Sequence, residues 1–196
     1  MQTAKELFIH ELTDMLDAEQ KLIEALGELS QDNPRPELQK AFSAHREQTQ
    51  GQAERIQQIF EELEEEPEET ECKGIKGLIE ERKAFKEEDP AEDILAVFDV
   101  GAAIKVENYE INAYTSLIDL ARDLGLNKAV KLLNQNLKEE QQTLKKMQGF
   151  KKKVKPENLG VEEEEFAEAE EQGSRQRGTA KRAGASRQRG KSRRAA

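Results

Sequence analysis

The chain has 196 residues, of which 37% are charged and 35% hydrophobic, and its formal net charge is -10. It has no Trp and a single cysteine, Cys72, which argues against a β-sandwich and excludes a framework of disulfides. No apolar run is long enough to span a bilayer and no secretory signal is visible, so we expect a cytoplasmic protein without membrane contact.

Charge divides the chain into unequal parts. Residues 172–196 contain nine Lys or Arg and no acidic residue, which leaves 22 basic and 41 acidic residues in 1–171. The basic segment has too few large apolar side chains to offset its ordering entropy, so it is expected to be a disordered tail. We predict a folded domain at 1–156, an acidic linker at 157–171 and the basic tail at 172–196.

Apolar residues in the predicted domain recur at helical rather than alternating spacing. The first helix should begin at Thr3, where Glu6 completes a capping box, and should end near Asn33 and Pro34. A second helix is predicted over about 37–65. The apolar face expected for the first helix consists of Phe8, Leu12, Met15, Leu16, Ile23 and Leu26.

Two further long helices are predicted, one between Pro90 and Gly125 and one from Asn127 to just before Pro156. The connection at 66–90 is long enough to cross a bundle and carries a short amphipathic helix of its own. Two helical hairpins joined by one such crossover give an all-α, ferritin-like four-helix bundle with a short fifth helix in the crossover. The face expected for the third long helix consists of Ile94, Val97, Gly101, Ile104, Ile111, Thr115 and Ile118.

Polar residues interrupt these apolar stripes near the middle of each long helix. A carboxylate that points into a helical core is costly unless it is paired, protonated or bound to a metal. Several carboxylates with one imidazole in such a core suit iron or manganese. The candidate ligands of this dinuclear site are Glu19, His45, Glu107, Glu110 and Glu140.

Each candidate also has a simpler interpretation. Glu19 could pair with a lysine, and His45 could be a satisfied core histidine. The spacing fixes the directions of Glu107 and Glu110 only to within one helical position. Glu139 should point away into solvent. His10 is expected on the surface or in a dimer interface. Cys72 is a single thiol without a nearby histidine partner, so nothing indicates that it is catalytic. No catalytic residue is assigned.

Five segments follow one another in an order typical of a known family: LFIHELTDMLDAEQKL, AFSAHREQTQGQAERIQQIF, CKGIKGLIEE, KVENYEINAYTSL and AVKLLNQNLKEEQQ. Over about residues 3–150, they resemble the YciE/YciF family of ferritin-like proteins. The resemblance implies a fold like that of rubrerythrins and manganese catalases, a dimer, a link to bacterial stress responses, and iron-binding or ferroxidase-like chemistry. In that pattern Glu107 and Glu110 match the paired glutamates of rubrerythrin, and Glu19 matches the glutamate of the first helix.

The chain departs from the ferritin-like pattern, in which the second and fourth helices each carry Glu-x-x-His. Glu47 and Glu140 are each followed, three residues later, by a neutral side chain. Neutral side chains bind hard cations more weakly than carboxylates, so a lower metal affinity is expected. The departures are Gln48, Gln50, Asn108 and Thr143, together with Leu144, where the family often has Asp.

Three functions follow from these observations. The first is a ferritin-like stress-response protein whose dinuclear iron or iron–manganese site oxidises ferrous iron with oxygen or peroxide, with Tyr109 or Tyr114 beside the ligands. The second is a metal-free structural or stress-protective homodimer. The third is weak nucleic-acid binding through residues 172–196, against which the tail could instead fold back on the acidic residues before it.

Overall fold

The structure, a computed structural model, describes residues 2–156, so the predicted linker and basic tail lie outside the described residues. Five helices and no strand occur in that range. The helices are α1 (Ala4–Asp32), α2 (Pro36–Leu63), α3 (Lys73–Glu87), α4 (Glu92–Asp123) and α5 (Asn127–Lys153). None of these five helices is long and apolar enough to cross a membrane.

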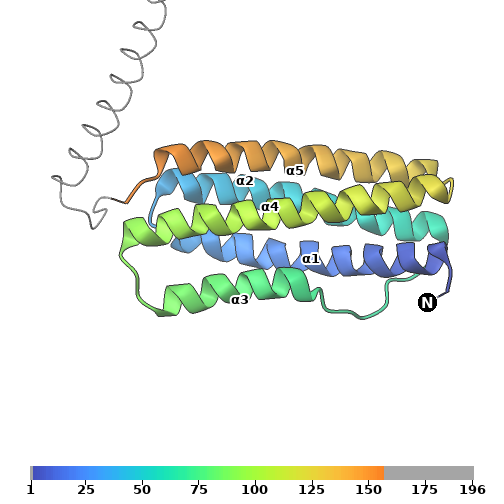
Figure 1. The fold of residues 1–196 in the computed structure, drawn as a ribbon, viewed down its shortest axis with the longest axis horizontal. Coiled ribbons are helices and arrows are strands. Elements are labelled where there is room, and N and C mark those ends of the chain that lie inside the picture. The colour runs from blue at the N-terminus through green and yellow to red at the C-terminus, as the bar shows by residue number, and fades with distance from the viewer. Residues whose placement is uncertain (1, 157–196) are drawn as a thin grey trace, which may run out of the picture. The chain divides into compact units, whose positions relative to one another are not determined.

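The four long helices lie side by side, and α3 runs along α1 and α4 on one side of them (Figure 1). The short turns α1–α2 and α4–α5 make each pair an antiparallel hairpin, and the segment containing α3 joins the two hairpins. The all-helical prediction and the short helix in the crossover are therefore confirmed.

Local sequence determines where the hairpins begin and turn. Thr3 Oγ1 accepts the Glu6 backbone N–H at 3.1 Å, and a Glu6 carboxylate oxygen accepts the Thr3 N–H at 3.2 Å, so the capping box is present. Pro36 occupies the first turn of α2, where its missing N–H costs nothing. The turn between α4 and α5 passes through Gly125 at φ +70°, a conformation that favours glycine.

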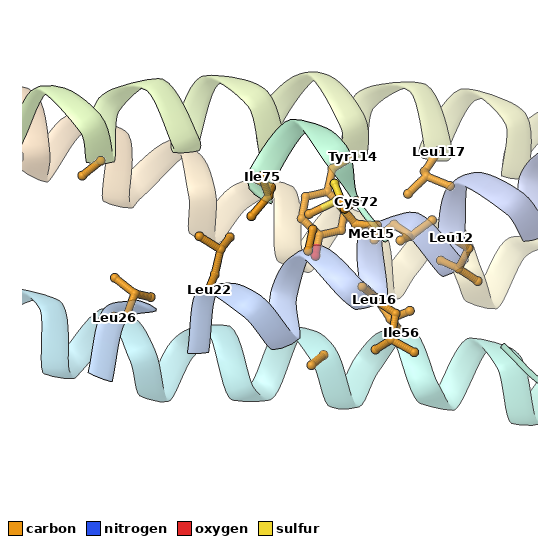
Figure 2. Packing of buried hydrophobic residues seen from close by; sticks show 14 of the residues in the cluster. Leu12, Met15, Leu16, Leu22, Leu26, Ile56, Cys72, Ile75, Tyr114 and Leu117 are labelled. Atoms are coloured by element: carbon orange, nitrogen blue, oxygen red, sulfur yellow. The ribbon is translucent and has the colours of Figure 1, made fainter. Parts of the chain in front are cut away.

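The apolar core occupies the space between the long helices. Its fully buried members include Phe8, Leu12, Phe42, Ile56 and Leu117. Figure 2 shows Leu12, Leu16, Leu22 and Leu26 in succession along α1, with Ile56 of α2 on one side and Leu117 on the other. These contacts hold the backbone of each helix in place on both sides of the polar residues considered below.

The expected apolar face of α1 is confirmed except at one residue, whereas that of α4 is displaced by about one helical position. On α1, Leu22 is buried and Ile23 is only half-buried. On α4, Ile118 is buried as expected. Most other residues of the face predicted for this helix are half-buried, and Thr115 is exposed. The buried line of α4 contains Leu95, Ala96, Asp99, Val100, Ala103, Glu107, Glu110, Tyr114, Leu117, Ile118 and Ala121. Because α4 is apolar on two sides, the period of its sequence could not show which side faces the core.

Both ends of α3 are attached to the long helices by polar contacts. At its beginning, the Cys72 N–H donates to Asp17 Oδ2 of α1 at 2.6 Å. Toward its end, the buried Arg82 guanidinium donates to Asp99 Oδ1 of α4 at 3.0 Å and to Asp32 Oδ1 of α1 at 3.2 Å. The crossover helix is thus fixed against α1 and α4 rather than lying loosely on the surface.

Candidate metal centre

All five predicted ligands lie in the core, on four different helices. Glu19 comes from α1, His45 from α2, Glu107 and Glu110 from α4, and Glu140 from α5. The four glutamates are at most 1% exposed and His45 is 5% exposed. Buried charge on this scale requires compensation within the protein or from a bound ion.

The five residues form two groups that share one member. His45, Glu107 and Glu140 bring donor atoms within 4.8 Å of one another, and so do Glu19, Glu110 and Glu140. In the first group, His45 Nε2 lies 3.5 Å from Glu107 Oε1 and 4.0 Å from Glu140 Oε2. Glu140 therefore belongs to both groups, each of which offers three candidate ligands.

Atoms without a hydrogen-bond partner are concentrated at this centre. Among the buried side-chain nitrogen and oxygen atoms of the described residues that lack such a partner, Arg35 Nε is the sole one outside it. The others are Glu19 Oε2, His45 Nδ1, Gln52 Oε1, both carboxylate oxygens of Glu107, Glu110 Oε2 and Glu140 Oε2. Buried polar atoms are rarely left unpaired in native proteins, and a bound cation is one partner that could satisfy the oxygens of this cluster.

Burial and mutual repulsion strongly change the acidity of these groups. Burial, together with the neighbouring Glu140 carboxylate, raises the pKa of Glu107 to about 11 and raises the pKa values of Glu19 and Glu110 well above their ordinary value. Burial raises the pKa of Glu140 to about 7. Burial also lowers the pKa of His45 to about 4, so its imidazole is neutral and able to ligate a metal at pH 7.

A set of hydrogen bonds orients two of the carboxylates. The Tyr114 hydroxyl donates to Glu19 Oε1, and Gln52 Nε2 donates to Glu140 Oε1. Asn136 Nδ2 connects these two donors, since it lies 2.9 Å from Tyr114 Oη and 3.2 Å from the Gln52 backbone oxygen. Arg55 in turn donates to Asn136 Oδ1. Such outer contacts fix ligand geometry in metal sites.

The donor set fits two divalent cations. Four carboxylates and one neutral imidazole carry four negative charges when ionised, which two divalent ions would balance. Imidazole suits iron among other transition metals and carboxylates suit manganese, so a mixed donor set of this kind is compatible with either metal. The unpaired oxygens of Glu107 face the position that an ion would occupy between Glu107, His45 and Glu140.

The comparisons with known proteins agree with this architecture. The family described as "Domain of unknown function (DUF892)" matches residues 3–159. The chain belongs to the DUF892 family. It is 40% identical to Protein YciF of Escherichia coli (strain K12) over 144 residues, which are 73% of this chain and 87% of that relative.

Solved structures place this DUF892 chain in the same fold. The crystal structure of the E. coli stress protein YciF matches with a TM-score of 0.74 and 39% identity, over 77% of this chain and 96% of that one. YcfI from Rhodopseudomonas palustris matches with a TM-score of 0.73 and 34% identity, over 76% and 94% of the two chains. The Xanthomonas campestris protein XCC3681, 18% identical with a TM-score of 0.62 over 78% and 93%, shows the fold alone.

Of the departures expected to weaken the DUF892 site, Thr143 is buried near the ligands, whereas two others lie on the surface. Gln50 and Asn108 are exposed, as is Glu47, so none of the three faces the centre. Gln48 is half-buried and donates to Thr143 Oγ1 at 3.2 Å. The neutral residues that actually face the core near the ligands are Thr49, Gln52, Asn136 and Thr143. The buried line of α2 runs through His45, Thr49 and Gln52, as the helical spacing predicts. The exposed departures were taken from the family pattern and not from this face.

Several supporting residues of the DUF892 site could be read from spacing, and others could not. Asn136 lies one turn before Glu140 and Gln52 two turns after His45, so both spacings mark the same helix face. Arg55 carries no such signal. Glu139 is not simply solvated as expected, because it pairs with Arg55. Tyr114 lies beside the ligands, whereas the half-buried Tyr109 contacts Cys72, with Sγ and Oη 3.3 Å apart.

Proposed function

We propose that this DUF892 protein is a cytoplasmic, ferritin-like four-helix bundle that binds two iron or manganese ions and oxidises ferrous iron. The observation that carries the proposal is the cluster of five buried donors with unpaired atoms around Glu140. A role in the stress response is supported by the similarity to the protein described as the E. coli stress protein YciF.

The assignment of ligands follows the two groups. His45 and Glu107 would hold one ion, Glu19 and Glu110 the other, and Glu140 would contact both. Bound ferrous ions supply the electrons of the reaction. Two ferrous ions lose one electron each, and dioxygen takes up these two electrons with two protons to give hydrogen peroxide.

The protein's own groups contribute charge and orientation. The carboxyls with raised pKa must release their protons when cations bind, so loading the site releases protons to solvent. Tyr114 and Gln52 each occupy one oxygen of a ligand carboxylate and leave the other oxygen free for the ion. Ionised carboxylates favour the ferric state, because they stabilise the higher charge.

Metal binding under anaerobic conditions tests this proposal. Purified chain, stripped with a chelator and titrated with ferrous iron or Co²⁺, should take up two ions per chain. Glu140→Gln should reduce uptake at both positions, because Glu140 belongs to both groups. Glu47→Gln is the matched control, since Glu47 is exposed on α2. Equal and weak binding by wild type, Glu140→Gln and Glu47→Gln would contradict a dinuclear site.

A metal-free structural or stress-protective role is the second candidate. It is supported by the raised pKa values, which allow the buried carboxyls to exist as neutral acids, and by the hydrogen bonds that tie α1, α2, α4 and α5 together at Tyr114, Gln52 and Asn136. Under this role, chelation would leave the melting temperature unchanged, whereas a true metal site must raise it on loading.

We also propose that the chain forms a homodimer. Four apolar residues of α4 support this, because they recur at helical spacing and stay partly exposed: Ile94, Val97, Ile104 and Ile111. Light scattering should give twice the chain mass, and Ile104→Glu should shift the protein to a monomer. A monomeric wild type at micromolar concentration would refute the dimer.

A further inference from the structure

An apolar cavity connects the surface with one half of the candidate metal centre. It lies between α1, α3 and α4, and its lining includes Leu22 and Leu26 of α1, Leu78 and Ile79 of α3, and Val106 of α4. Its lining also includes the exposed Glu28 and Lys83 and the buried His45 and Glu107. The cavity is therefore lined both by surface residues and by two of the five candidate ligands.

The size of the cavity limits what can occupy it. Its volume is about 50 Å³, whereas a cavity of roughly 10–15 Å³ on the same measure holds one water. A molecule of two or three heavy atoms fits, and an organic metabolite does not. Its walls are mainly aliphatic, and the polar side chains in the lining are Glu28, His45, Arg82, Lys83 and Glu107. The aliphatic part of the wall offers no compensation for the desolvation of an ion.

The position of α3 explains why the cavity exists. Arg82 fixes α3 to Asp99, and Cys72 fixes the residue before its first turn to Asp17. Between these two attachments, Leu78 and Ile79 are only half-buried, because they face the cavity rather than a filled core. Glu28 of α1 and Lys83 of α3 lie 3.8 Å apart at the outer end and form an ion pair.

We propose that this cavity is the path by which dioxygen reaches the metal centre. The proposal rests on the proposed function, and it assigns the oxidant and its route. Dioxygen is small, uncharged and more soluble in apolar media than in water, which matches both the volume and the lining. Hydrogen peroxide needs hydrogen bonds that aliphatic walls do not provide, and a ferrous ion needs ligands. Glu107 and His45, both of which carry buried atoms without a hydrogen-bond partner, belong to the lining of the cavity.

Xenon tests the cavity independently of any metal. Wild-type protein without metal should bind xenon, which enters dry apolar cavities, and the xenon should give a shifted ¹²⁹Xe resonance. Ala102→Phe should abolish that shift, because Ala102 lines the cavity and is half-buried on α4. Ala113→Phe is the matched control, being half-buried on the same helix outside the cavity lining. A wild type that binds no xenon would overturn the proposal.

Stopped-flow oxidation of bound ferrous iron by dioxygen tests the route. Ala102→Phe should slow oxidation by about tenfold or more, equivalent to roughly 1.4 kcal/mol in the barrier to entry, while Co²⁺ affinity stays within about twofold of wild type and Ala113→Phe keeps the wild-type rate. An unchanged oxidation rate in a variant that has lost its xenon signal would refute the route.

Leu78→Ala provides the reverse change, since it widens the cavity without adding bulk near a ligand. It should raise the rate of iron oxidation at low oxygen concentration. A rate equal to that of wild type would count against the proposal. This test does not depend on whether Ala102→Phe folds. Failure of the wild type to bind Co²⁺ would refute the metal function instead, while leaving the xenon result to decide whether the cavity takes apolar gases.

Discussion

The Tyr114 hydroxyl of α4 donates a hydrogen bond to the Glu19 carboxylate of α1, and both side chains are fully buried. The same hydroxyl accepts a hydrogen bond from Asn136 of α5. One phenol therefore connects three helices at the level of the candidate metal centre. Burial and the Glu19 carboxylate raise the pKa of Tyr114 well above its ordinary value, so the hydroxyl remains a donor at every physiological pH.

Tyr114→Phe removes this donor and leaves the shape of the ring unchanged. We expect the free energy of unfolding to fall by about 1–3 kcal/mol, because Glu19 Oε1 then lacks a partner in the core and the Asn136 amide keeps only the Gln52 backbone oxygen. Chemical denaturation followed by circular dichroism measures the change. The helix content of the folded variant should equal that of wild type, and a variant as stable as wild type would show that the hydrogen bond contributes nothing.

Much of this arrangement could be predicted from the sequence. Helical periodicity indicates where the helices lie and which polar residues interrupt the middle of their apolar faces. Glu19, His45 and Glu140 were placed correctly because strongly one-sided apolar stripes surround them. The face of α4 could not be chosen, because its sequence is apolar on two sides and tertiary packing decides between them.

Contacts between helices that are far apart in the sequence could not be predicted either. Arg55 bonds to Asn136 and Arg82 to Asp99, and no local pattern pairs these residues. The cavity beside His45 depends on how α3 packs, and that packing follows from the two polar attachments of α3 rather than from its own periodicity.

Glu107→Gln should have opposite effects on stability and on metal binding. In the metal-free protein, Glu107 has to be protonated on folding, because its pKa rises from 4.5 to about 11. Glutamine removes that cost. At pH 7, the free energy of unfolding of the metal-free variant should therefore be at least about 1 kcal/mol higher than that of wild type. Its Co²⁺ affinity should fall by at least the roughly 10–100-fold typical of losing an outer contact. Calorimetry measures both quantities, and a destabilised metal-free variant would contradict the protonated state.

The stability that the buried carboxyls give the metal-free protein should fall as pH rises above about 4.5. The folded-state pKa of Glu140 is about 7 and that of Glu107 about 11, both above the ordinary 4.5, so the folded state holds protons that the unfolded state has released. Stability from these carboxyls is fully present below pH 4.5 and is lost as pH rises through the folded-state values, by at most about 1.4 kcal/mol per pH unit for each.

His45 acts in the opposite direction at lower pH. Its folded-state pKa is about 4 against an ordinary 6.5, so it removes stability as pH falls from 6.5 to 4 and has no effect above that range. Urea denaturation with a chelator at pH 6.5 and pH 9 should show the decrease caused by the carboxyls, and saturating Co²⁺ should abolish it by holding them ionised. A metal-free protein that gains stability between these pH values would disprove the assignment.

Arg82→Ala should be among the most damaging substitutions on α3. Arg82 and Asp99 side chains are 9% and 0% exposed, and removing the guanidinium leaves the Asp99 carboxylate buried with Asn33 as its remaining partner. The expected loss is about 3–5 kcal/mol. Lys86→Ala is the control, because its contact with Asp32 is largely exposed and should contribute about 1 kcal/mol or less. Equal effects of the two substitutions in thermal unfolding would refute the importance of the buried pair.

The basic segment at 172–196 allows a separate electrostatic test of nucleic-acid binding. Its nine cationic side chains can neutralise several phosphates, and each contact releases condensed counterions, so any binding should weaken steeply with salt. The acidic remainder of the chain, with 41 acidic and 22 basic residues, repels DNA and competes for the same cations. We expect weak gel shifts at low salt that a modest salt increase abolishes. Deleting 173–196 should remove them without changing helix or metal content, and shifts that survive the deletion would place the contact on residues 1–172.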